Sequence, residues 1–234
     1  MRKIRYAKPT RTNNEEEFDI VDIDINEQIE KIYKINKVND MEIQRSLIDF
    51  NIIRLVSQFE SGMKSACVMA FEDIKESNIY DFENIQIPVN ELRKLDDADI
   101  SSGQIFASSF NFQNPYQTQT FFSNIFQKDL FESFRKFLEY NQKSLMSLEK
   151  EQEILESKEE YEFSEKALQK ILLNQKSINS SIDEFIEIFN IRNKISHDPS
   201  FSSDIKPDHL CSMFLIQYLL LFFITFAIQI KSHD

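Results

Sequence analysis

The stretch IFNIRNKISHDP, Ile188 to Pro199, carries polar residues where an apolar helical stripe would continue. At 100° per residue, the apolar positions before it share a face about 100° wide, which is typical of a helix that packs on a core. These positions are Ile178, Ile182, Phe185, Ile186 and Phe189. The same face continues with Arg192, Asn193, Ser196 and His197. Unpaired burial would cost about 1–3 kcal/mol per group, so we expect these four side chains to have partners.

The helix that carries these polar residues is predicted to span Ser177 to Asp198. Pro199 disfavours helical geometry in the residue before it, which indicates a helix end at Asp198. Arg192 and His197 lie about 140° apart around such a helix. They would therefore flank a groove, with Asn193 between them.

The string R-N-x-x-x-H, formed by Arg192, Asn193 and His197, resembles the R-x4–6-H signature of the HEPN superfamily. These are all-helical proteins, many of them metal-independent endoribonucleases in toxin–antitoxin and phage-defence systems. The chain looks most like the RiboL-PSP-HEPN group or a near relative. IIRLVSQFESGM, Ile52 to Met63, is similar to that group's N-terminal helix, an apolar run that ends in an aromatic–Glu pair. The resemblance covers roughly residues 40–231 and implies an all-α, up-and-down helical bundle.

The resemblance implies that Arg192, Asn193 and His197 are catalytic, with Ser196 and Asp198 beside them in support. A histidine with an ordinary pKa near 6.5 can serve as base or acid, and an arginine suits a phosphate. Each chain offers one such histidine, whereas cleavage needs a base and an acid on opposite sides of the phosphate. Two motifs that meet across a two-fold axis would supply both, which implies a homodimer and 2′,3′-cyclic phosphate products.

One position departs from a known HEPN pattern. HEPN toxins paired with nucleotidyltransferases often have a tyrosine two residues after the histidine, where this chain has Pro199. Control by modification of that tyrosine is therefore not expected here.

Glu60 is an acidic residue on the apolar face of a predicted first long helix, which runs from about Asp40 to Ser77. A buried carboxylate is costly unless it is paired, and Arg192 is the expected partner. The alternative is that Glu60 lies at the edge of the stripe and reaches water.

The remaining segments divide the chain into an N-terminal arm and one helical domain over 40–231. Residues 1–39 are predicted to form a basic arm followed by an extended segment, with a short strand as the alternative for Phe18 to Ile25. Residues 78–120 are predicted to be an irregular insertion, with one short helix around Val89 to Leu95. Phe121 to Gln142 is expected to form one phenylalanine-rich core helix, and 143–177 an exposed charged helical segment.

The last helix is predicted to start at Lys206-Pro207-Asp208, because proline is well placed in a first turn. Leu210 to Ile230 contains no charged residue, which satisfies the length and composition of a membrane span. A buried central helix of a bundle has the same composition, and the resemblance favours it. We therefore expect a cytoplasmic protein without a membrane span.

The composition excludes several classes of function. The net charge is −12, whereas a general nucleic-acid binder would be basic, so any RNA contact must be local. With 2 Gly in the chain, a phosphate-cradling loop is not expected, and no metal-binding or other cofactor motif is present. The two cysteines, Cys67 and Cys211, lie in apolar runs and are expected to be buried thiols.

Three hypotheses follow from the sequence. The first is a HEPN endoribonuclease that acts on RNA as an effector in antiviral defence or as a toxin opposed by an antitoxin. The second is a non-catalytic HEPN-type dimeric scaffold that binds a partner protein of a defence system. The third is a membrane-associated helical protein that uses Leu210 to Ile230.

Overall fold

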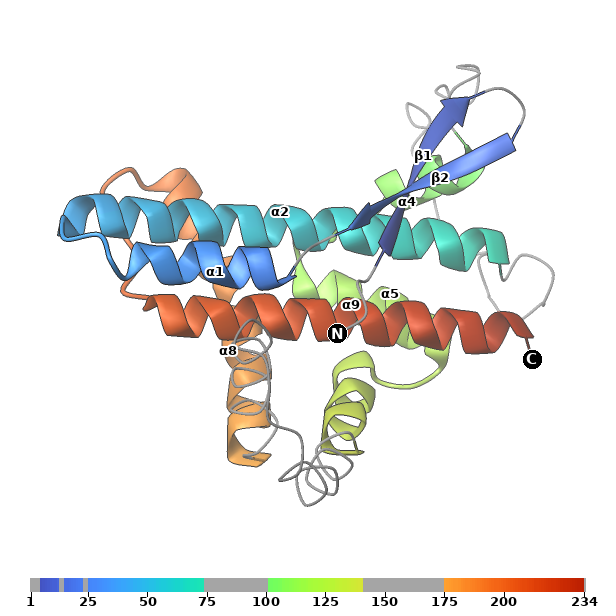
Figure 1. Ribbon diagram of the computed structural model, residues 1–234. Coiled ribbons are helices and arrows are strands. Elements are labelled where there is room, and N and C mark those ends of the chain that lie inside the picture. The colour runs from blue at the N-terminus through green and yellow to red at the C-terminus, as the bar shows by residue number, and fades with distance from the viewer. Residues whose placement is uncertain (1–4, 13–14, 23–24, 74–100, 141–174, 234) are drawn as a thin grey trace, which may run out of the picture. The chain divides into compact units, whose positions relative to one another are not determined.

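The computed structural model describes residues 5–12, 15–22, 25–73, 101–140 and 175–233 (Figure 1). Apart from one N-terminal hairpin this part of the chain is helical, which confirms the predicted all-α class for the described residues from 25 onward. The elements are β1 (Arg5–Thr12), β2 (Glu15–Asp22), α1 (Ile25–Ile35), α2 (Met41–Asp73), α4 (Ser102–Ser108), α5 (Pro115–Phe126), α8 (Gln175–His197) and α9 (Pro207–His233). A further helical stretch covers 130–140.

The chain forms two compact units, which are described separately. The first comprises residues 1–23, 57–130 and 221–234, and the second comprises 24–56 and 131–220. The boundaries fall within α2, after Val56, and within α9, after Leu220. Segments 78–100 and 143–174 lie outside the described residues. The predicted short helix at Val89 to Leu95 and most of the predicted charged helical segment fall within them.

Two helices occupy parts of the end of the segment that was predicted to be irregular, so that prediction was wrong for residues 102–108 and 115–120. Helix α4 begins with a capping box, in which Ser101 and Gln104 each satisfy the other's backbone N–H. Asn114 is the N-cap of helix α5, and its side chain accepts from the N–H of Tyr116. The helix also has a proline in its first turn. Local capping therefore starts both helices without a long periodic apolar pattern.

The phenylalanine-rich run was predicted to be one helix, but it is divided at Gln127. That residue adopts the left-handed region, with φ of 52°, and ends α5. Ser123 stabilises the break, because its carbonyl accepts from the N–H of Lys128 and its hydroxyl accepts from the N–H of Leu130. The helical stretch 130–140 starts immediately afterwards.

A cluster of phenylalanines forms the core of the first unit, and the prediction of core rings is confirmed for those members that lie in the Phe121 to Gln142 run. Phe112 and Phe122 are fully buried, and Phe122 packs edge-on against Phe121 with ring centroids 4.9 Å apart. The cluster consists of Phe71, Phe106, Phe110, Phe112, Phe121, Phe122, Phe126 and Phe223. Helix α4 comes close to α2 at Gly103, where a Cβ would lie 3.2 Å from Cγ1 of Val68.

Within the predicted N-terminal arm, β1 and β2 form an antiparallel hairpin (Figure 1). Its register places each basic residue of β1 opposite an acidic residue of β2: Arg5 opposite Asp22, Lys8 opposite Asp19, and Arg11 opposite Glu16. The charge pattern of the two strands thus favours this register. The predicted alternative of a strand at Phe18 to Ile25 is correct in part, since β2 ends at Asp22.

The second unit contains α1, which the sequence analysis did not predict. Residues Ile29, Ile32 and Ile35 of α1 are buried, at 1%, 1% and 5% exposure. The turn to α2 is fixed by Asp40, whose carboxylate accepts from the N–H groups of Glu42 and Ile43 at 2.9 and 3.1 Å. The side chain of Gln44 donates to the carbonyl of Ile35 and ties α2 to the end of α1. Asp40 therefore caps α2, as predicted.

Helix α9 is buried on most sides along its first half but not along its second. Leu210, Leu215, Ile216 and Leu220 have exposures of 0%, whereas Phe222, Phe226 and Ile230 are 40–48% exposed. The span Pro207–Ile230 has the length and apolar character to cross a membrane, and 61% of its most apolar window is buried within the protein. A core helix of a soluble protein has the same properties.

Both cysteines are buried free thiols, as expected. Burial raises the pKa of the Cys67 thiol far above its usual range. Burial, followed by the nearby Asp208 carboxylate, raises the pKa of Cys211 to about 12. Both thiols are therefore protonated, and so poor nucleophiles, at neutral pH.

Candidate functional site

Helix α8 ends at His197, one residue before the predicted end. The N–H of Asp198 still donates to the carbonyl of Lys194 at 2.8 Å, and Pro199 follows. The Asp198 carboxylate then accepts from both the hydroxyl and the backbone N–H of Ser200, at 2.6 and 2.9 Å. These two bonds, the hydroxyl first, lower the pKa of Asp198. Asp198 thus forms a local turn that closes the motif helix.

The polar quartet lies at the surface, which corrects the expectation that it extends a buried face. Arg192 is half-buried, whereas Asn193, Ser196 and His197 are exposed. The buried part of the stripe ends at Phe189, which is 2% exposed, and the last two turns of α8 lie beyond the core of their unit. Water can therefore solvate these polar groups, so the predicted cost of burial does not arise for three of them.

Arg192 and Asn193 are joined directly. The Nη1 group of Arg192 donates to Oδ1 of Asn193 at 3.1 Å. The Nε of Arg192 is buried and has no hydrogen-bond partner in the described part of the chain. A guanidinium has five N–H groups. The Arg192 side chain uses one of them to bond Asn193 and retains others that could donate hydrogen bonds to an anion.

A hydrogen-bonded latch holds the loop after the motif against α2. The Asp49 carboxylate accepts from the backbone N–H and the hydroxyl of Ser203, at 3.1 and 2.8 Å, and from the hydroxyl of Ser202 at 3.2 Å. The ammonium group of Lys194 lies 5.8 Å from the ring centroid of Phe201, which joins the last turn of α8 to the same loop. This latch was not predictable from the sequence, because the bonded residues are more than 150 positions apart.

Replacing Asp49 with alanine is expected to destabilise the loop. Ser203 is 4% exposed, so its N–H and hydroxyl would lose their acceptor inside the protein. Such a loss costs about 1–3 kcal/mol, which urea denaturation would measure. Asp204→Ala removes an exposed acid from the same loop and is expected to change stability by less than about 0.5 kcal/mol. Equal effects of the two variants would exclude the latch.

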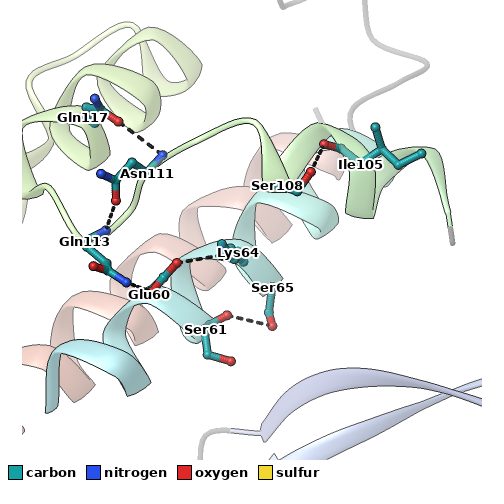
Figure 2. Close-up of polar contacts among 9 residues, drawn as sticks. All are labelled: Glu60, Ser61, Lys64, Ser65, Ile105, Ser108, Asn111, Gln113 and Gln117. Carbon is teal, nitrogen blue, oxygen red and sulfur yellow. Dashed lines mark hydrogen bonds and ion pairs between the residues drawn. The ribbon is translucent and has the colours of Figure 1, made fainter. Parts of the chain in front are cut away.

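Glu60 lies in the first unit and has partners there (Figure 2). Its carboxylate forms an ion pair with Lys64 at 2.7 Å and accepts from the side-chain amide of Gln113. The side chain is 20% exposed, which places it at the edge of the apolar stripe, as in the alternative expectation. Arg192 lies in the other unit, so its pairing with Glu60 stays a prediction.

His209 makes a contact that was not predicted from the sequence. Its Nε2 lies 2.6 Å from Oε2 of Glu184 on α8. The other oxygen of Glu184 accepts from the hydroxyl of Ser180 at 2.7 Å. This contact joins α8 to the start of α9 and stabilises the packing of the motif helix.

Comparisons with known proteins supply no relative: no family model, no curated protein and no solved structure matches the chain. Within the described residues, no group of three or more histidine, cysteine or acidic side chains is arranged to hold a metal ion.

Proposed function

We propose that the chain is a metal-independent endoribonuclease of the HEPN type, a cytoplasmic effector of antiviral defence or a toxin opposed by an antitoxin. The observation that carries the proposal is the end of α8, where Arg192 is bonded to Asn193 and His197 is exposed one turn further on. This arrangement leaves the imidazole accessible to an RNA substrate. The latch at Asp49 supports the proposal, because a catalytic helix end must be held in position.

The proposed chemistry assigns a role to each residue of the motif. Arg192 stabilises the charge that develops on the attacked phosphate, and Asn193 orients the guanidinium. His197 of one copy takes the proton from the ribose 2′-hydroxyl. His197 of a second copy protonates the leaving 5′-oxygen, so the active enzyme is a homodimer.

Incubation of the purified protein with total RNA in the presence of EDTA tests the proposal. We expect cleavage products that end in 2′,3′-cyclic phosphates, because the 2′-hydroxyl is the nucleophile. Ends that carry a 3′-hydroxyl, or cleavage that requires a divalent metal, would contradict the mechanism.

A second candidate is a non-catalytic HEPN-type scaffold that binds a partner protein. The charge distribution favours it: the net charge is −12, and the basic residues of β1 stand opposite acidic residues of β2 instead of forming a basic stripe. An acidic surface suits a protein partner better than RNA. A folded dimer that leaves RNA intact and is captured by a protein encoded beside it would favour the scaffold.

A further inference from the structure

The first half of α2 carries an exposed apolar stripe in the second unit. Ile43, Leu47 and Phe50 are 53%, 37% and 62% exposed, although they are large apolar side chains. Together with Arg54 they fall within a stripe about 60° wide at 100° per residue. We call these four residues the α2 seam. It lies opposite the buried face of the helix, to which Ile48, Ile52 and Leu55 belong.

The spacing of the α2 seam is that of a helix–helix interface. Its members follow one another at intervals of four, three and four residues, which is the a/d spacing of a coiled coil. Single exposed apolar residues are ordinary on a protein surface. Three in succession at this spacing instead form a continuous strip with the spacing of a helix–helix contact.

We propose that the α2 seam binds the α2 seam of a second copy of this chain, with the two helices antiparallel. Antiparallel alignment places Leu47 of each copy beside Phe50 of the other and Arg54 beside Ile43. Arg54 then lies within about one turn of the acidic start of the partner helix, where Asp40 and Glu42 stand. A two-fold interface requires such self-complementarity.

The charges disfavour the parallel alternative. Parallel alignment would place Arg54 beside Arg54 and the acidic helix starts beside each other, and both contacts are repulsive. It would also align the two helix dipoles, whereas the antiparallel arrangement opposes them. A cation at one end of the α2 seam and acids at the other therefore favour a second copy of the chain, with its α2 antiparallel, as the partner that covers this seam.

The inverted arrangement also has a consequence for the motif, and this step rests on the proposed function. Asp49, which holds the loop after the motif, lies between Leu47 and Phe50 in sequence and about 130° around the helix from the centre of the α2 seam. The two-fold axis of an antiparallel pair keeps the corresponding flanks of both helices on the same side. The two latched loops would therefore lie at the same level along the pair and on the same side of it.

The first test is the oligomeric state of wild type and of Phe50→Glu, measured by analytical ultracentrifugation. Wild type is expected to be a dimer, and Phe50→Glu is expected to dimerise about thirtyfold or more weakly, as for an interface hot spot. Phe226→Glu, at a phenylalanine that is 48% exposed on α9, is the matched control and should leave the dimer intact. A monomeric wild type, or a dimer unaffected by Phe50→Glu, would overturn the proposal.

The second test determines the direction of the helices by disulfide formation. An equal mixture of Leu47→Cys and Phe50→Cys proteins should form mainly the mixed disulfide, whereas Leu47→Cys alone should form little. The buried native thiols, Cys67 and Cys211, should not compete. Efficient cross-linking of Leu47→Cys with itself would overturn the antiparallel arrangement. A dimer that passes both tests without cleaving RNA would count against the proposed function alone. A dimer that cleaves RNA and is unaffected by Phe50→Glu would count against this interface alone.

Discussion

His197→Ala is expected to reduce RNA cleavage by about 10²–10⁴-fold, the usual effect of removing one general acid–base group. Both proton transfers are assigned to this residue in the dimer, so the loss should be near the upper end of that range. The stability change should be less than about 0.5 kcal/mol, because the side chain is exposed. Initial rates of cleavage and urea denaturation of the two proteins measure these effects.

His209→Ala is the matched control for that experiment. It removes a histidine whose partner is Glu184 and which lies outside the motif, so cleavage should remain near the wild-type rate. A folded His197→Ala protein that cleaves RNA as fast as wild type would eliminate the nuclease proposal. The scaffold would then become the favoured function.

Phe122→Ala is expected to destabilise the protein by about 3–5 kcal/mol, the usual cost of truncating a buried aromatic residue. Phe122 has 0% exposure, and its ring contacts Phe112, Phe121 and Phe126 within the phenylalanine cluster. Truncation would leave a cavity that the surrounding rings cannot readily fill, since they are held by one another. The free energy of unfolding in urea is the measurement.

Tyr116→Ala on the same helix is the control for Phe122→Ala. Tyr116 is 65% exposed, so its truncation should change stability by about 0.5 kcal/mol or less. If the two variants unfolded at the same urea concentration, the phenylalanine cluster would not be the core of its unit.

The long helices were predictable because each combines an apolar pattern, periodic in α2 and α8 and continuous in α9, with a local end signal. Asp40 starts α2, Pro207 starts α9, and Pro199 limits α8, and the structure bears out each of them to within one or two residues. Helix α1 was also detectable, from isoleucines at 25, 29, 32 and 35. It was missed because the alternating segment just before it suggested that the extended structure continued.

Other features depend on contacts that one-dimensional patterns do not contain. The break at Gln127 requires hydrogen bonds from residues 128 and 130 back to Ser123, with no proline or glycine to mark it. In the candidate site, the sequence predicted the positions of the motif residues along the helix and the end of that helix. It did not predict how exposed the motif side chains are. A helical wheel gives the direction of a side chain and not whether another element covers it, and so the quartet beyond Phe189 was wrongly expected to be enclosed.

The hairpin has a consequence for how an RNA would approach the protein. Residues 1–22 contain five basic and five acidic residues, so this segment is neutral and the remaining chain carries the net charge of −12. A polyanion is therefore repelled during diffusion and is not steered toward the motif. Moderate salt shortens the range of this repulsion. The bimolecular encounter with RNA should then become faster as ionic strength rises, the reverse of the behaviour of proteins that bind nucleic acids through extended basic surfaces.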